Sequence, residues 1–72
     1  DKAHALLVDT GDGGYRVSVR APYNRKYGAD DLCRRFKSGG GRKAAAGINQ
    51  LDSPLLSEFE DQFFNQFNRK QA

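Results

Sequence analysis

The sequence predicts a single α+β domain: a small antiparallel sheet, made of a hairpin and a third strand, with two helices, one of them packed across the sheet. Three observations predict it. Apolar and polar residues alternate over 15–20, as in a half-buried strand. Apolar residues recur with helical spacing over 29–36 and again over 55–67. Turn-forming residues separate these segments, and 72 residues make one domain at most.

The first two strands are expected to form a hairpin. The apolar run 5–8 is followed by the turn cluster 10–14, and alternation then runs from Tyr15 to Arg20. An Asp-Gly-rich connection of this kind favours antiparallel pairing. Pro22 ends the second strand because proline has no N–H to donate to a ladder. Arg20 then lies on the polar face of its strand.

A short helix is expected between Ala29 and the glycine run 39–41, with Asp30 or Asp31 as its N-cap. Its apolar stripe consists of Ala29, Leu32, Cys33 and Phe36. Its last turn holds cations that suit the helix dipole, namely Arg34, Arg35 and Lys37. Cys33 is interpreted as a small buried hydrophobe and not as a nucleophile. The glycines end the helix, as C′ glycines commonly do.

Residues 44–51, AAAGINQL, leave two interpretations open. The alanines favour a helical turn, whereas Gly47, Ile48 and Leu51 are compatible with a strand. We expect a short turn followed by a third strand of about five residues.

The second helix is the best specified element. Ser53 is expected at its N-cap and Pro54 at its first position. Its apolar stripe consists of Leu55, Leu56, Phe59, Phe63 and Phe67, with Phe64 at the edge. Early acidic residues (Glu58, Glu60, Asp61) and late basic ones (Arg69, Lys70) both suit the dipole. The stripe is expected to cover the sheet as core, and a partner-binding face is the alternative.

Charge is distributed unevenly along the chain. Residues 15–43 carry nine basic and two acidic side chains, a net +7, whereas the remaining segments sum to −4 and the whole chain to +3. The middle of the chain therefore favours an anionic ligand, and an ordinary solvated basic surface is the alternative.

The glycine run 39–41 is longer than a helix stop requires. Glycine lets a ligand approach the backbone closely, and successive N–H groups can form an anion-binding nest. If residues 42–46 begin a helical turn, their free N–H groups point to the same place. Arg42 and Lys43 add cations there, and arginine can hold a phosphate through two hydrogen bonds. No GKS or GKT follows, so the segment is not a nucleotide-triphosphate P-loop.

The stretch Gly39-Gly40-Gly41-Arg42-Lys43-Ala44-Ala45-Ala46-Gly47 resembles the GGGH-K-x-A-A-G motif in the C-terminal substrate-binding domain of DHH-type phosphoesterases, with Arg42 at the histidine position. The strand Arg16-Val17-Ser18-Val19-Arg20-Ala21 is similar to the V-S-x-R-S strand of that family, and the helix ADDLCRRF lies between the two motifs in the family's order. The resemblance covers roughly residues 5–67. The family includes RecJ-type exonucleases, nanoRNases, cyclic dinucleotide phosphodiesterases and exopolyphosphatase-related proteins.

This resemblance implies a function in two parts. A separate catalytic domain with an Asp-His-His motif would hold Mn or Mg and hydrolyse the substrate. The domain in hand would bind the phosphates of a short oligonucleotide or dinucleotide through Arg20, Gly39, Gly40, Gly41 and Arg42, with Lys43 beside them. Whether arginine in place of histidine alters activity stays open, although arginine is at least as good a phosphate ligand.

Residue content excludes several other functions. A single cysteine, Cys33, permits no internal disulfide, and with His4 as the only histidine no metal cage is expected in this domain. Without metal ligands or a general base, residues 1–72 alone are expected to be non-catalytic. No apolar run is long enough for a membrane span, and no signal peptide is recognisable, which favours the cytoplasm. The chain lacks a starting methionine, so we expect a domain taken from a longer protein. A free-standing RNA-binding or protein-binding adaptor is the alternative.

Overall fold

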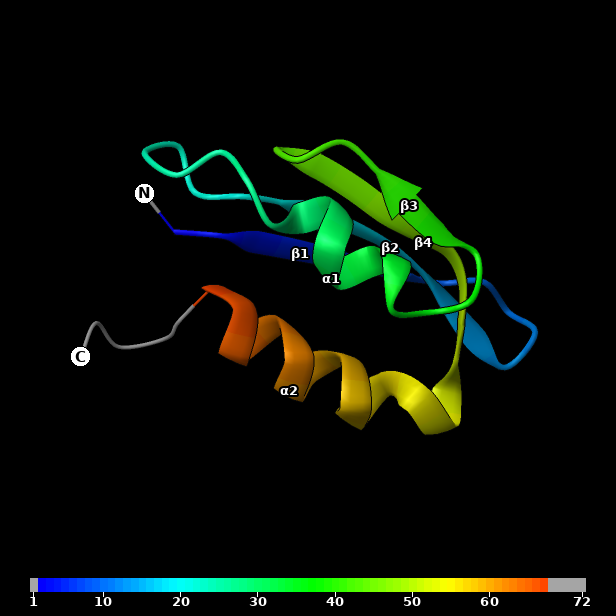
Figure 1. Ribbon diagram of the computed structural model, residues 1–72. Coiled ribbons are helices and arrows are strands. Elements are labelled where there is room, and N and C mark those ends of the chain that lie inside the picture. Colours follow the sequence, from blue (N-terminus) through cyan, green and yellow to red (C-terminus); the bar gives the residue numbers. More distant parts are fainter. Residues whose placement is uncertain (1, 68–72) are drawn as a thin grey trace.

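The computed structural model describes residues 2–67 and has an α+β fold, a four-stranded antiparallel sheet with two helices packed against it (Figure 1). The predicted fold class is therefore confirmed. In chain order the elements are β1 (His4–Asp9), β2 (Gly14–Arg20), α1 (Ala29–Arg34), β3 (Gly39–Gly41), β4 (Ala45–Asp52), the 3₁₀ turn η1 (Ser53–Leu55) and α2 (Leu56–Phe67).

The sheet has the strand order β1-β2-β4-β3, and every neighbouring pair is antiparallel. The predicted β1–β2 hairpin is present, with His4 opposite Arg20 and Asp9 opposite Tyr15. Thr10 closes its turn by donating its N–H to the carbonyl of Gly14 at 3.0 Å. The pairing of β2 with β4 shifts register between Tyr15 and Val17, at a β-bulge.

The glycine run is a strand and not a helix-ending loop, which corrects the sequence prediction. Gly39, Gly40 and Gly41 form β3 and lie opposite Ile48, Gly47 and Ala46 of β4. Glycine has a low strand propensity, so nothing local favours this conformation. Pairing with the longer strand β4 is what holds these residues extended, and it gives the sheet a fourth strand that the sequence did not predict.

The expected helical turn over 42–46 is also wrong. Arg42 and Ala45 exchange both backbone hydrogen bonds, at 2.8 and 3.2 Å, so residues 42–45 form a tight hairpin turn between β3 and β4. Strand β4 therefore starts at Ala45 and is eight residues long, instead of a short segment after a turn. The alanines adopt extended structure because β2 and β3 flank them on both sides.

Helix α1 differs from prediction at both ends. Its N-cap is Gly28, in the left-handed conformation with φ 101°, and no side chain caps the helix. Asp30 instead accepts a hydrogen bond from the N–H of Asp31. The helix ends at Arg34, so Arg35 is its C-cap and Lys37 lies beyond it. The predicted apolar stripe is nevertheless confirmed as core, because all four of its residues are buried.

Helix α2 begins where the sequence predicted, within a few residues. The predicted N-cap is wrong, because Asp52 caps the 3₁₀ turn η1 and Ser53 lies inside it. Pro54 is in the first turn of η1, and the α-helix proper starts at Leu56. Phe59 is fully buried, while Phe63 and Phe67 pack against the core from its edge. Leu55 departs from the prediction, being 42% exposed. Arg69 and Lys70 lie outside the described residues.

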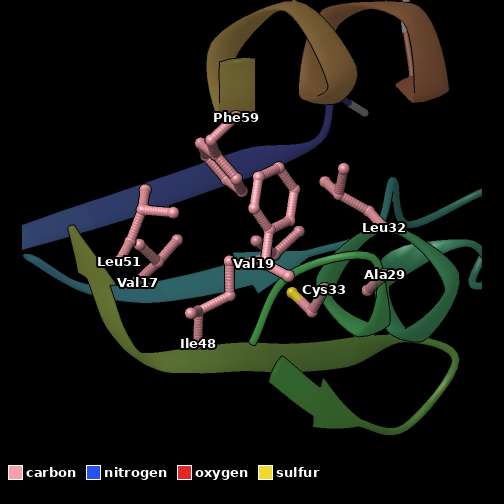
Figure 2. Packing of buried hydrophobic residues seen from close by; sticks show 9 residues of the cluster. Val17, Val19, Ala29, Leu32, Cys33, Ile48, Leu51 and Phe59 are labelled. Atoms are coloured by element: carbon pink, nitrogen blue, oxygen red, sulfur yellow. The ribbon is translucent and has the colours of Figure 1, made fainter. Parts of the chain in front are cut away.

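The core lies between the sheet and the two helices. Figure 2 shows the side chain of Phe59 pointing from α2 towards residues of β2, β4 and α1. Phe59 meets Phe36 edge-to-face, with ring centroids 5.7 Å apart. The buried cluster consists of Val17, Val19, Ala29, Leu32, Cys33, Phe36, Ile48, Leu51 and Phe59. Both helices thus cover one face of the sheet, and no helix within residues 2–67 covers the opposite face.

Candidate functional site

The uncovered side of the sheet, called the open face below, is identified by the strand register. Val17 and Val19 point into the core, so their neighbours in β2 point the other way. Residues paired with those neighbours share the same face. The open face therefore consists of His4, Leu6, Val8, Arg16, Ser18, Arg20, Gly40, Ala45 and Gly47.

Arg42 belongs to this face too. It exchanges two hydrogen bonds with Ala45, so the two side chains lie on the same side of the sheet. Ala45 is in turn the β4 partner of Arg20, and Arg20 is the β2 partner of His4. The result is a cross-strand row, His4–Arg20–Ala45–Arg42, in which the small side chain of Ala45 separates two arginines.

The next row along the open face consists of Leu6, Ser18, Gly47 and Gly40. Gly40 and Gly47 have no side chains, so the backbone is uncovered beside the two arginines. A Cβ built on Gly40 meets no atom of residues 2–67 within 4 Å. Nothing in the described fold therefore requires glycine at position 40.

The two other glycines of β3 have structural roles. A Cβ on Gly39 would lie 1.7 Å from the carbonyl oxygen of Cys33, so only glycine lets the strand pass under α1. Gly41 has φ 135° and would place a Cβ 2.5 Å from the Cα of Ala46. Of the three glycines predicted to contact phosphate, only Gly40 lies on the open face with free space in front of it.

Backbone amides around the glycines are largely paired inside the protein. Gly39 donates to the carbonyl of Phe36 at 3.0 Å, and Arg42 donates to the carbonyl of Ala45. Lys43 is exposed at the hairpin turn, where its carbonyl accepts the first N–H of α1, that of Ala29, at 3.0 Å. The turn therefore anchors α1 to the sheet. An anion would therefore bind here mainly through cationic side chains and less through free backbone N–H groups.

Two arginines of the basic segment 15–43, Arg34 and Arg35, make side-chain hydrogen bonds within the fold. Arg34 donates to Asp30 at 3.4 Å and to the carbonyl of Gly41 at 3.2 Å. Arg35 donates to Gln62 and Gln66 of α2, at 2.6 and 3.0 Å, and so fastens one helix to the other. These two arginines are therefore used within the fold.

Arg20 and Arg42 differ from Arg34 and Arg35. Both are exposed, and within residues 2–67 no hydrogen bond or ion pair occupies either guanidinium. Each therefore has its donors free for an external oxygen ligand.

A basic depression of about 360 Å³ adjoins this row at one end of the sheet. The loop 21–28 and the hairpin turn 42–44 meet there, near the start of β1 (Figure 1). Two of its lining residues are hydrogen-bonded to each other, because the N–H of Ala21 donates to the carbonyl of Ala44 at 2.9 Å. Its lining consists of Lys2, His4, Arg20, Ala21, Tyr23, Lys26, Ala44 and Ala45.

Sequence reasoning found Arg20 but not the rest of this depression. Lys2 and His4 come close to Tyr23 and Lys26 because β1 pairs with β2, which brings the start of the chain beside the loop that follows β2. The available signal was the hairpin register, which places His4 opposite Arg20.

Residues 2–67 contain neither a metal-binding cluster nor a membrane-spanning helix. No group of three His, Cys, Asp or Glu side chains in that range is arranged to hold a metal ion. No helix of the described chain is long and apolar enough to cross a membrane. Comparison with protein-family models, curated proteins and solved structures finds no match to this chain.

Proposed function

We propose that this domain binds the phosphates of a short oligonucleotide or dinucleotide on its open face and presents them to a catalytic domain of the DHH phosphoesterase type. The observation that carries the proposal is the row in which Arg20 and Arg42 flank Ala45, with the uncovered backbone of Gly40 alongside. Two unpaired guanidinium groups on one face fit phosphate oxygens, which arginine binds through paired hydrogen bonds.

Motif resemblance supports the part of the proposal in which a DHH-type catalytic domain acts on the bound substrate. The segment 39–47 and the strand ending at Arg20 resemble two motifs of the DHH family, and the fold brings residues of both onto one face. On this proposal, hydrolysis and its Mn or Mg ions belong to a separate domain, and residues 2–67 supply substrate binding only.

Titration of a labelled di- to pentanucleotide at several salt concentrations tests the binding. Because phosphate contacts release counterions, the logarithm of the affinity should fall with the logarithm of salt, with a slope of about −0.7 for each phosphate neutralised. Two arginines holding separate phosphates predict a slope near −1.4. A lack of binding at low salt, or binding that does not respond to salt, would contradict the proposal.

A protein-binding adaptor is the second candidate, favoured by one observation. Leu6 is 64% exposed and Val8 is 50% exposed, and both lie on the open face of β1. Such a pair suits a protein partner better than a phosphate. The encoding gene distinguishes the candidates, because an upstream Asp-His-His domain is expected only for the phosphoesterase.

A further inference from the structure

We infer that the free edge of β1 pairs with the same edge of a second copy of this chain, so that the two sheets join into one continuous antiparallel sheet. β1 is an outer strand that is bonded to β2 on one side, and no strand within residues 2–67 pairs with its other side (Figure 1). The inference is independent of the proposed function, because it concerns how two copies of the domain meet and not what they bind.

The hydrogen-bonding pattern of the hairpin shows which backbone groups reach this edge. Thr10 donates its N–H to the carbonyl of Gly14, so these two residues form a hydrogen-bonded pair. Such pairs alternate with non-hydrogen-bonded pairs along an antiparallel ladder. Residues at even positions of β1 therefore direct their N–H and C=O groups towards β2. Those at odd positions, whose groups point to the free edge, are Ala5, Leu7 and Asp9.

Strand β1 lacks the features that commonly keep an edge strand from pairing. It contains no lysine and no proline, and its pairing with β2 has no bulge that would twist the edge away. The opposite edge of the sheet differs, because β3 is only three residues long and the carbonyl of Gly41 already accepts a hydrogen bond from Arg34. Within the described chain, β1 is therefore the edge that is open to a further strand.

The side chains of β1 suit a second copy of the same strand. Leu6 and Val8 are exposed on the open face although both are apolar. In an antiparallel pairing centred on Leu6, it lies opposite the partner's Leu6, and His4 lies opposite the partner's Val8. Ala5 then lies opposite the partner's Leu7, so that edge-facing backbone groups meet each other. The exposed apolar side chains of the two copies gather in one cluster at the two-fold axis.

Charge complementarity selects both the second copy and the antiparallel direction. The β1 edge starts beside a cation, Lys2, and ends beside two carboxylates, those of Asp9 and Asp12. In the register centred on Leu6, Lys2 lies opposite the partner's Thr10, a residue whose hydroxyl donates to the carboxylate of Asp12. Opposite charges therefore meet at both ends of the interface, whereas parallel pairing would bring like charges together.

Pairing of this kind ends at a dimer. Each copy uses the same edge, so the contact is isologous and leaves no β1 edge free. The two-fold axis is perpendicular to the sheet, because residues opposite each other in an antiparallel pair point to the same side. The helices of both copies then lie on one side and both open faces on the other. Arg20 and Arg42 of the two copies therefore face the same direction.

Sedimentation velocity of the chain from about 1 μM to about 1 mM tests the inference, since this range covers the dissociation constants expected for a small interface. The parent should form dimers and no larger species. Leu6→Lys should weaken the dimer at least about tenfold, because it places two like charges opposite each other, about 5 Å apart. The melting temperature of the dilute variant should stay that of the dilute parent, because Leu6 is exposed.

Ser18→Lys is the matched control for this charge. Ser18 is exposed on the open face beside Leu6, but one strand further from the axis. The two copies of position 18 are three strand spacings apart, about 14 Å, which exceeds the Debye length of about 8 Å at physiological salt. Ser18→Lys should therefore leave the dimer within about twofold of the parent, a small fraction of the 1.4 kcal/mol that corresponds to tenfold.

Proline substitutions test whether the backbone makes the contact. The N–H of Ala5 faces the free edge, so Ala5→Pro removes no hydrogen bond within the fold but removes one from each copy in the dimer. It should weaken the dimer and leave the melting temperature of the dilute chain unchanged. Leu6→Pro is its counterpart, because it removes an N–H directed to β2 and should lower that melting temperature.

Charge reversal tests the direction of pairing. Lys2→Glu and Asp12→Lys should each weaken the dimer, and an equimolar mixture of the two variants should dimerise like the parent, because the charges are again complementary. A parent that stays monomeric up to about 1 mM would overturn the inference. Dimers that Leu6→Lys and Ala5→Pro leave unchanged would overturn it too, because another surface would hold them. Assemblies larger than the dimer would show that β1 pairs with a different edge, which contradicts the self-pairing.

Discussion

Arg20 lies in β2 and Arg42 in the turn between β3 and β4, yet both side chains lie in one row on the open face with only Ala45 between them. Twenty-one positions separate them in the sequence, and a hairpin turn brings the second arginine back beside the first. The fold thus places two free guanidinium groups side by side on the open face.

Replacing either arginine by alanine should weaken oligonucleotide binding by about 1.5–3 kcal/mol, the range for hydrogen bonds to charged groups. Neither change should lower the melting temperature, because both side chains are exposed and make no contact that stabilises the described fold. Calorimetric titration of both single variants and the double variant measures the effect. If the arginines hold the same phosphate, the double variant should show a coupling of about 0.5–3 kcal/mol. If both single variants bind the oligonucleotide as tightly as the parent, Arg20 and Arg42 do not contribute to the binding site.

The glycine strand provides a test that separates stability from binding. Gly39→Ala should destabilise the domain by about 1–3 kcal/mol or more, because its Cβ would collide with the carbonyl of Cys33. Gly40→Ala should be neutral or stabilising by up to about 1 kcal/mol, because its Cβ meets open space. Thermal melting of the two variants compares them directly, each kilocalorie shifting the midpoint by roughly 4–8 °C.

Gly40→Val tests whether the exposed backbone at position 40 takes part in oligonucleotide binding. The branched side chain suits a strand, so stability should hold, but it covers the backbone beside the arginines and should weaken oligonucleotide binding. A valine variant that folds and binds like the parent would show that Gly40 has no part in the site.

The sequence predicted the elements whose signals are local. Alternation from Tyr15 to Arg20 identified β2, and helical spacing identified both helix stripes, because each pattern reports which side of one element is buried. The glycine strand could not be predicted in this way. Its extended shape comes from pairing with β4 and from the passage of Gly39 under Cys33, two tertiary contacts without a local signature.

The candidate site was predictable only in part, for the same reason. Arg20 and the segment 39–43 were recognised from motif resemblance, yet their sharing of a face depends on the register of three strands. The role of His4 and Lys26 in the depression depends on which parts of the chain meet at one end of the sheet. The sequence of a glycine run does not show which glycine the fold requires and which one a ligand could contact. The structure distinguishes them, because a Cβ added at Gly39 would collide with Cys33, whereas a Cβ added at Gly40 would meet no atom.

Phe59 and Phe64 form a matched pair on α2 for testing the core. Phe59 is 1% exposed and contacts Phe36, whereas Phe64 is 59% exposed. Phe59→Ala should cost about 3–5 kcal/mol, most or all of the stability of a domain this small. Phe64→Ala should change the free energy of unfolding by no more than about 0.5 kcal/mol. Urea denaturation of both variants measures the difference, and equal midpoints would mean that α2 does not pack on the sheet as described.

The buried thiol of Cys33 predicts how stability depends on alkaline pH. Burial, with the nearby Asp30 carboxylate adding to it, raises the pKa of the Cys33 thiol from 9.0 to about 11. The folded state therefore holds this proton more tightly than the unfolded chain. The resulting stability is fully present below pH 9 and is lost as the pH rises towards 11, by at most about 1.4 kcal/mol per pH unit.

Cys33→Ala is the control for this prediction, because tyrosines and lysines titrate over the same range in both proteins. The free energy of unfolding of the parent minus that of the variant should fall between pH 9 and 11 and stay level below pH 9. Thiol labelling gives an independent measurement, since a protonated, buried sulfur reacts only when the domain opens. Labelling of the native chain at the rate of the urea-unfolded chain would show that Cys33 is accessible, and a level difference across pH 9–11 would show that its thiol ionises equally in both states.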